Sequence, residues 1–184
     1  EAYLKEELSR RFPSHAFVGE EGSGEGSKAE PFTWVVDPLD GTTNFLNRLS
    51  SFACSIALLQ EGIPVVAAVF MPWPNHELGR VFHSHRGGGA WDGEIPLQVA
   101  SGESPVPGRV VVVPGLAAGP LRARAALRKN PGERRSLGST ATELALAAHG
   151  TYQYVVFSAP RIWDVAAGVL LVQESQGQVL TRGP

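Results

Sequence analysis

The strongest chemical signal in the sequence is a pair of aspartates three residues apart, Asp37 and Asp40, within the stretch Trp-Val-Val-Asp-Pro-Leu-Asp-Gly-Thr-Thr-Asn-Phe. An apolar strand leads into the pair, and a proline and Gly41 favour a rigid turn to which a ligand can come close. Two carboxylates this near each other repel unless a cation lies between them. The neighbouring Leu39 carbonyl and Thr42 hydroxyl are hard oxygen ligands, which favour Mg²⁺ or Mn²⁺ over zinc.

The same stretch could hold a phosphate group. The backbone N–H groups of residues 41–43 fall at the expected start of a helix, which favours anions. A purely structural turn is the alternative, because Asp-Gly is a common turn dipeptide and Asp92-Gly93 is interpreted as such a turn. The Asp-x-x-Asp spacing does not fit the Asp-x-Asp-x-Thr signature of haloacid-dehalogenase-type phosphatases, and the sequence contains no P-loop pattern.

Two other acidic positions could join this pair. Glu20 lies in a Gly-Glu-Glu-Gly segment after a short expected strand, and Asp164 follows a tryptophan at the expected start of a helix. Each has a simpler interpretation when taken alone, Glu20 as a solvated loop charge and Asp164 as a helix cap. Together with Asp37 and Asp40, they would build one metal cluster from acidic loops.

Strands and helices that are mixed along the chain must position these carboxylates. The best-marked helix covers 140–149, where Thr140 and Glu143 form a capping-box pattern and Gly150 follows. Strands are expected at 16–18, 32–36, 52–59, 63–70, 78–83, 90–91, 95–99, 110–113, 152–157 and 178–181, a loop at 19–30, a tight turn at 37–43, and further helices at 2–12, 44–49, 121–129 and from 163 or 164 to 174. The mixture predicts an α+β or layered α/β fold in a single domain over residues 1–184.

The composition is that of a folded globular domain. Its 184 residues suffice to bury a core, and 43% hydrophobic with 18% charged residues exclude a disordered chain. A net charge of −2 argues against a nucleic-acid partner, and no apolar run reaches membrane-spanning length. The single cysteine, Cys54, excludes an intrachain disulfide, favours a cytoplasmic setting and is assigned to the core. His76, His83 and His85 lack a zinc-type spacing, so they receive no metal role.

Four segments in this order resemble the inositol monophosphatase family over nearly the whole chain: Gly-Glu-Glu, the Asp-Pro-Leu-Asp-Gly-Thr block, a Gly-Ser-Thr-Ala helix start and Trp-Asp-Val-Ala-Ala-Gly. The Asp-Pro-Leu-Asp-Gly-Thr block is the most specific of the four. The resemblance implies an α-β-α-β-α sandwich, usually a homodimer. It also implies lithium-sensitive hydrolysis of phosphate monoesters by water that two or three Mg²⁺ ions activate.

The resemblance also implies roles for individual residues. The metal ligands would be Glu20, Asp37, Asp40, Asp164 and the Leu39 carbonyl. Catalysis would rest on Glu20, Asp37, Asp40 and Thr42, with Thr42 contacting the attacking water. Substrate would be bound by the N–H groups of Gly41 and Thr42, and by Ser139 and Thr140 beside its alcohol portion.

Two departures from the family pattern bear on function. Family members carry a Thr-x-x-Asp type segment in an N-terminal helical region, and this chain starts after that region, so we expect a trimmed chain that lacks N-terminal helices and the C-terminal end. Phe157 stands where inositol-selective members have an acidic residue, and a phenyl ring cannot accept a hydrogen bond from a sugar hydroxyl. Strict inositol selectivity is therefore not expected. Arg161 could contact a second anionic group of the substrate, with a solvent-facing arginine as the alternative.

The leading hypothesis is Mg²⁺-dependent hydrolysis of a small phosphorylated polyol or sugar. Inositol monophosphate, fructose 1,6-bisphosphate, histidinol phosphate and a 3′-phosphonucleotide all remain open as substrates. A second hypothesis is a metal- or phosphate-binding protein without turnover, motivated by the missing N-terminal aspartate. A third is a structural dimer partner, which the four acidic positions oppose.

Overall fold

The computed structural model describes residues 1–22, 30–102, 106, 108–112 and 132–181. Its main body is a seven-stranded sheet in which the strands follow one another in sequence order. The strands are β1 (Ala16–Gly19), β2 (Phe32–Asp40), β3 (Ala53–Gln60), β4 (Ile63–Trp73), β5 (His76–His85), β6 (Ala90–Asp92) and β7 (Ile95–Pro96). β1 pairs with β2 in parallel, and every later pair is antiparallel.

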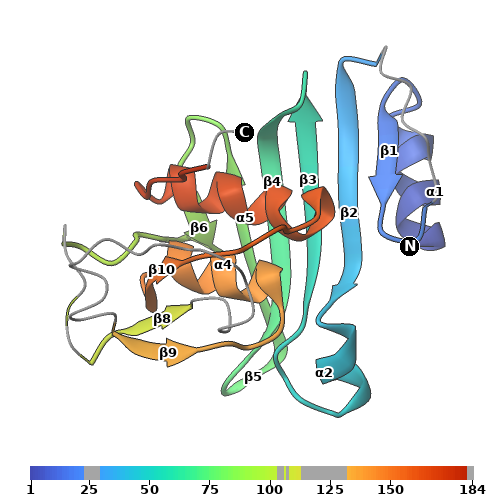
Figure 1. Cartoon of the computed structure of the whole chain (residues 1–184). Helices are drawn as coiled ribbons and strands as arrows, with labels where there is room; N and C mark the ends of the chain where they lie inside the picture. Colours follow the sequence, from blue (N-terminus) through green and yellow to red (C-terminus); the bar gives the residue numbers. More distant parts are fainter. Residues whose placement is uncertain (23–29, 103–105, 107, 113–131, 182–184) are drawn as a thin grey trace.

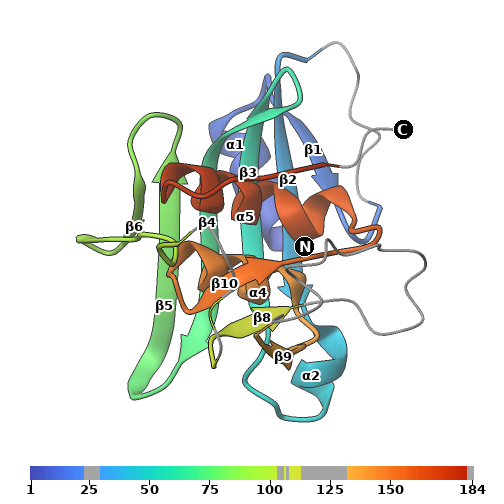
Figure 2. The same cartoon turned by 60° about the vertical axis from the view of Figure 1, so that its left-hand side comes forward.

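Helices and a second sheet complete the layers (Figure 1). α4 (Thr140–Ala148) and α5 (Ile162–Glu174) cover one face of the large sheet. Beyond α4 lies a parallel three-stranded sheet in the order β10 (Tyr152–Val155), β8 (Val110–Val112), β9 (Glu133–Arg135), which lies in front of α4 in Figure 2. α1 (Ala2–Arg11) lies at the β1–β2 edge of the large sheet, where the ring centroids of Phe12 and Trp34 are 5.4 Å apart. The alternating layers confirm the expected layered α/β class.

The core fills the space between the large sheet and the two helices. Along β3, buried residues alternate with half-buried ones, as expected for a strand with one face on the core. The α5 side chains that meet this face include Leu170 and Leu171, which are at most 2% exposed. Gly168 of α5 lies against Leu144 of α4, where an added Cβ would come within 2.4 Å of the Leu144 Cβ. The two helices therefore pack closely side by side.

The structure corrects several expected boundaries. β2 continues to Asp40, so the expected tight turn at 37–43 is the irregular end of a strand, followed by α2 (Thr42–Leu46). The predicted capping box at Thr140 is wrong, because Ser139 is the N-cap of α4 and accepts the Thr142 N–H at 3.3 Å. The strand expected at 178–181 does not form. The helix expected at 121–129 lies outside the described residues. Within the described part of the chain, no helix is long and apolar enough to cross a membrane.

Candidate metal centre

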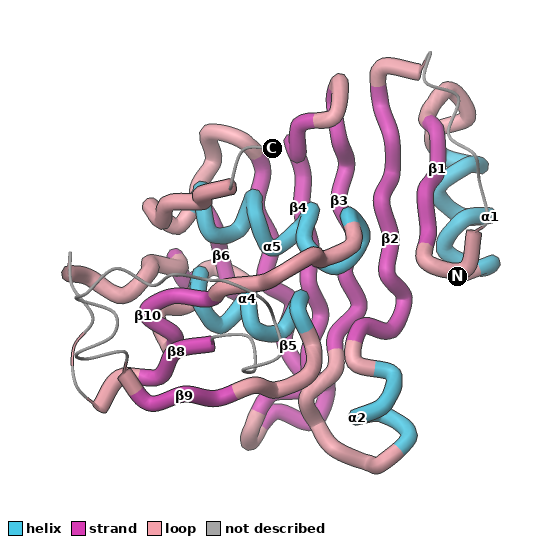
Figure 3. Tube along the Cα trace, in the orientation of Figure 1, coloured by secondary structure: helices cyan, strands magenta, loops and turns pink. Residues whose placement is uncertain are grey.

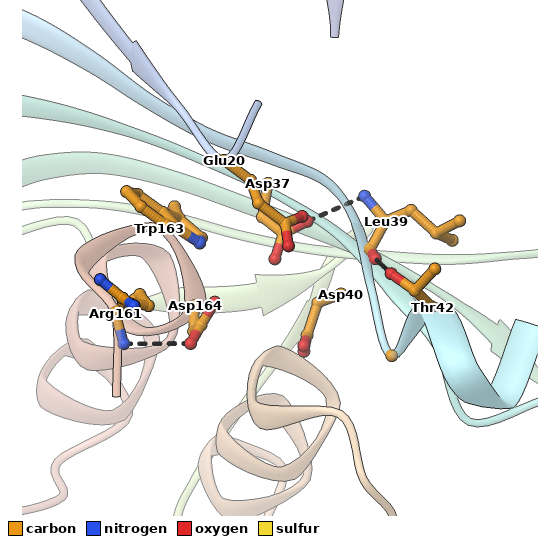
Figure 4. Close-up of a pocket in the computed structure, with 9 residues that line it drawn as sticks. Glu20, Asp37, Leu39, Asp40, Thr42, Arg161, Trp163 and Asp164 are labelled. Carbon is orange, nitrogen blue, oxygen red and sulfur yellow. Dashed lines mark hydrogen bonds between the residues drawn. The ribbon is translucent and has the colours of Figure 1, made fainter. Parts of the chain in front are cut away.

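Three aspartates from two distant parts of the chain converge at one end of α5 (Figure 4). Asp37, Asp40 and Asp164 each offer a carboxylate oxygen, and these atoms all lie within 4.8 Å of one another. Asp37 and Asp40 come from the end of β2, and Asp164 from the first turn of α5. Figure 3 shows why they meet: the starts of α4 and α5 are both directed toward β2. The structure thus brings together three of the four carboxylates expected from the sequence.

An irregularity in β2 allows both of its aspartates to point to the same side. Residues three apart in a regular strand face opposite sides of the sheet. Here the pairing of β2 with β3 shifts register between Asp37, opposite Ser55, and Asp40, opposite Ala53. Such a bulge re-aims the side chains that follow it. Gly41 then adopts φ +85°, and an added Cβ would lie 2.8 Å from the Ser51 carbonyl oxygen, so the chain needs glycine at this point.

Asp37 is the most deeply placed carboxylate of the group. The residue is only 2% exposed, and its Oδ1 accepts the N–H of Leu39 at 2.9 Å. Burial, the largest cause, and repulsion from the other carboxylates together raise the pKa of Asp37 to about 7, against the lowering effect of the Leu39 N–H. A buried carboxylate with like charges around it is stabilised by a cation.

Asp40 is anchored to the start of α4. Its Oδ2 accepts the Ser139 hydroxyl at 2.7 Å and the Ala141 N–H at 2.6 Å. Burial raises the pKa of Asp40, although both of these hydrogen bonds favour the ionised form. Because both donors use Oδ2, Oδ1 has no hydrogen bond to any described residue and is available to a ligand.

Asp164 is held by the local geometry of α5. Its Oδ2 accepts the N–H of Arg161 at 3.0 Å, which closes the capping arrangement at the start of the helix. The start of α5 is tied to the large sheet, because the Ser55 hydroxyl donates to the Trp163 carbonyl at 3.3 Å. Asp164 is therefore not the N-cap, which is Arg161, but its carboxylate takes part in the capping from the third position of α5 and also belongs to the triad.

An open cavity of about 540 Å³ surrounds the triad, a size suited to a small ligand. It is lined by Glu20, Asp37, Leu39, Asp40, Gly41, Thr42, Arg161, Trp163 and Asp164. Glu20 is exposed at the rim and is not one of the three converging carboxylates. The Thr42 hydroxyl donates to the Leu39 carbonyl at 3.1 Å, which holds both groups at the cavity wall.

The two residues expected to face a substrate's alcohol portion are not among those that line the cavity, although Ser139 bonds to a lining residue. Ser139 is 1% exposed and bonds to Asp40, and neither it nor Thr140 lines the cavity. Phe157 is half-buried and packs against the core, whereas Arg161 does line the cavity.

Sequence reasoning gave no role at this site to Asn44 or Glu143, which both bond to the segment before α4. Asn44 links α2 to the segment before α4, and Glu143 is a 4% exposed carboxylate on α4. A signal existed for Glu143, because it is the only charged residue in an otherwise apolar and small-residue helix.

The donor set fits a divalent cation. Every candidate ligand is a carboxylate or carbonyl oxygen, which suits Mg²⁺ or Mn²⁺. Burial and mutual repulsion hold the pKa of Asp37 high, which is the condition that a cation relieves.

Similarity to known proteins assigns the chain to a family. The model of the inositol monophosphatase family matches residues 1–183. Quinic acid degradation cluster protein x of Neurospora crassa is 32% identical over all of this chain and 62% of its own length. Inositol-1-monophosphatase of Rhizobium meliloti is 34% identical over 96% of this chain and 67% of its own length.

A solved structure agrees with these sequence matches. The crystal structure of extragenic suppressor protein suhB from Bartonella henselae superposes with a TM-score of 0.75 at 32% identity, over 94% of this chain and 68% of that one. The chain thus spans about two thirds of the length of the proteins it matches, and 62% of the Neurospora relative. With the family model matched from residue 1 to 183, the chain belongs to the inositol monophosphatase family.

Proposed function

We propose that the protein hydrolyses a small phosphate monoester, a phosphorylated polyol or sugar, with Mg²⁺ or Mn²⁺ at the Asp37–Asp40–Asp164 centre. The observation that carries the proposal is the convergence of three carboxylate oxygens within 4.8 Å in an open cavity. Relatives support the reaction class. One is named inositol-1-monophosphatase, and another, from Aquifex aeolicus and 30% identical, is named fructose-1,6-bisphosphatase/inositol-1-monophosphatase.

The chain's own residues would bind and orient the reactants. When bound, two or three divalent cations would neutralise the phosphate, lower the pKa of the attacking water and stabilise the leaving oxygen. Asp37, Asp40 and Asp164 would hold these cations, with Glu20 and the Leu39 carbonyl as further ligands from the cavity wall. The Thr42 hydroxyl would orient the attacking water. The N–H groups of Gly41 and Thr42 would hold phosphate oxygens, so that the ester is positioned for in-line attack.

Phosphate release from a panel of esters tests this reaction. The full-length protein is expected to turn over at least one phosphomonoester with Mg²⁺ and to stop with EDTA, because the carboxylate cluster cannot bind an anionic ester without cations. Inhibition by Li⁺ is expected from the family resemblance. Mg²⁺ binding without turnover on any ester would instead favour the metal- or phosphate-binding alternative.

The proposal includes a homodimer in the cytoplasm. A single cysteine, Cys54, supports a reducing compartment, and the family resemblance supports the dimer. Sedimentation of the preparation used in the assay tests the dimer, which a purely monomeric protein would contradict. Cell fractionation tests the compartment, and recovery outside the cytosol would contradict it.

A bisphosphate is the second candidate substrate, on the evidence of Phe157, which packs against the core, and Arg161, which lines the cavity. Phe157 offers no acceptor for a sugar hydroxyl, whereas Arg161 lines the cavity with its guanidinium carbon 5.9 Å from the Trp163 ring centroid. An arginine beside the centre could pair with a second phosphate. Fructose 1,6-bisphosphate and a 3′-phosphonucleotide both carry such a group.

An Arg161→Ala variant tests this second candidate. A hydrogen-bonded charge pair contributes about 1.5–3 kcal/mol, so kcat/KM on a bisphosphate should fall by about 10- to 100-fold. The loss on a monophosphate should stay within about threefold, since the cations would hold its only phosphate. Equal losses on both substrates, measured in parallel steady-state assays, would remove Arg161 from substrate selection.

A further inference from the structure

A second buried carboxylate, which the proposed chemistry does not use, lies behind the centre on α4. Glu143 is 4% exposed, and its Oε1 accepts the N–H of Leu137 at 2.5 Å. The N–H of Gly138 is a further donor to it. Burial raises the pKa of Glu143, and these two backbone donors oppose that effect. The carboxylate therefore binds the segment that leads into its own helix, and it is not among the residues that line the cavity.

The same segment is held from the other side by Asn44. Its Nδ2 donates to the Leu137 carbonyl at 2.5 Å and to the Ser51 carbonyl at 2.6 Å. Leu137 is thus fixed at its N–H by α4 and at its carbonyl by α2. Because Asn44 lies only four residues after Asp40, this contact ties the segment to the end of β2.

The fixed segment places the two donors that anchor Asp40. Gly138 adopts φ +73°, and the chain then enters α4 at Ser139. The Ser139 hydroxyl and the Ala141 N–H both reach Asp40 Oδ2, at 2.7 and 2.6 Å. A shift in the start of α4 would move both donors together and would free the Asp40 carboxylate to rotate.

We propose that Glu143 is a positioning residue for the metal centre: it fixes the start of α4, which fixes Asp40 and thereby sets the affinity for the divalent cation. This inference rests on the proposed function, since the cation belongs to it. Removing a group that hydrogen-bonds to a metal ligand and orients it typically lowers metal affinity or activity by about 10- to 100-fold. Glu143 acts through Ser139 and Ala141, not on the cation.

A matched control exists at the other end of α5. Glu174 also accepts two backbone N–H groups of a glycine-containing turn, from Gly87 at 2.9 Å and from Gly89 at 2.9 Å. It lies at the last residue of the helix that begins beside Asp164, and it does not line the cavity. A Glu174→Ala variant therefore removes the same kind of contact without touching the start of α4.

The experiment measures Mn²⁺ binding by electron paramagnetic resonance in the full-length protein. Glu143→Ala should raise the Mn²⁺ dissociation constant by about 10- to 100-fold. Glu143→Gln should raise it by only about three- to tenfold, because its amide oxygen can still accept the Leu137 N–H through a weaker, uncharged bond. Glu174→Ala should stay within about twofold of the unsubstituted protein.

Hydrogen exchange of the Ala141 amide supplies a readout that needs no metal. Its exchange should be at least about tenfold faster in Glu143→Ala and unchanged in Glu174→Ala, because only the first variant releases the start of α4. Should Glu143→Ala fail to fold, Glu143→Gln takes its place in both measurements.

Two results would separate this inference from the proposed function. Mn²⁺ affinity and Ala141 protection that both match the unsubstituted protein in Glu143→Ala would overturn the positioning role. An unsubstituted protein that binds no Mn²⁺ would overturn the proposed function and the claim on cation affinity, whereas the Ala141 exchange would still decide whether Glu143 fixes the start of α4.

Discussion

An Asp40→Asn variant is expected to lose at least about 10³-fold in phosphatase kcat/KM while it keeps its fold. The amide oxygen of Asn can replace Oδ2 as acceptor for the Ser139 hydroxyl and the Ala141 N–H, so the anchor to α4 survives. The amide NH₂ group then replaces the free Oδ1 and presents hydrogens where a cation would bind. Loss of several kcal/mol of charge stabilisation corresponds to a rate loss of this size.

Thermal unfolding without metal should show that the fold is kept. Burial raises the pKa of Asp40, with the charges of Asp164 and Glu20 as further causes, so removal of its charge should leave the melting temperature unchanged or higher. Steady-state kinetics with saturating Mg²⁺ and circular dichroism would measure the two effects separately.

A matched control is Asp92→Asn, at the other Asp-Gly step of the chain. Asp92 pairs with Arg80 at 2.5 Å, far along the sheet from the triad, so its loss should lower stability and leave kcat/KM within about threefold. An Asp40→Asn variant that retained full activity would remove Asp40 from the mechanism.

The convergence of the three aspartates was predictable from the sequence because their positions are concentrated in short segments. Asp37 and Asp40 lie in one specific block, and Asp164 follows a tryptophan at a helix start, so each position could be identified locally. Their meeting required the fold, and the resemblance supplied it. The central strands were predictable for a similar reason: β3 and β4 are long apolar runs joined by a glycine-containing turn.

The choice of the residue that caps α4 depended on a contact between residues that are distant in sequence. Ser139 and Thr140 are adjacent hydroxyl residues, and either could cap α4 by local rules. Asp40, 99 residues away from Ser139, selects Ser139, because the Ser139 hydroxyl is then directed to the half-buried Asp40 carboxylate. Glu143 consequently bonds to Leu137 instead of closing a capping box on Thr140.

Contacts with a partner strand also explain why the predictions for the end of β2 and for residues 178–181 were wrong. A proline between the two aspartates suggested a turn, yet pairing with β3 resumes at Asp40 after the register shift. Residues 178–181 have a strand-like composition but pair with no described strand, because β-structure needs a partner that local sequence does not supply. Strand and cap assignments thus depended on contacts that only the folded chain provides.

The metal-free protein is expected to lose stability as pH rises from about 4 to about 7, with Asp37 as the main cause. Burial raises the pKa of Asp37 from 3.8 to about 7. Between these values the unfolded chain loses the proton while the folded protein keeps it, so the folded state binds more protons and its stability falls with pH. The full effect amounts to about 4 kcal/mol at most. Burial likewise raises the pKa values of Asp40 and Glu143, which act in the same direction.

Mg²⁺ should reverse this dependence. A cation binds the ionised carboxylates, so its stabilising effect grows as pH rises and the protons leave. Melting temperatures from pH 5 to 8, measured with EDTA and with Mg²⁺, should diverge by several degrees toward high pH. His149 contributes a stability change of the opposite sign, because burial lowers its pKa and the folded state then binds fewer protons than the unfolded chain.

An Asp37→Asn variant separates these contributions. With EDTA, its melting temperature should fall less between pH 5 and 7 than that of the unsubstituted protein, since the main titrating group is gone. The remaining slope would belong to Asp40, Glu143 and His149. The Mg²⁺-induced rise should shrink as well, because the variant lacks one of the three converging carboxylates. If instead Asp37→Asn kept both the slope and the Mg²⁺ response of the unsubstituted protein, the buried carboxylate at the end of β2 would not be the group that couples folding to cation binding.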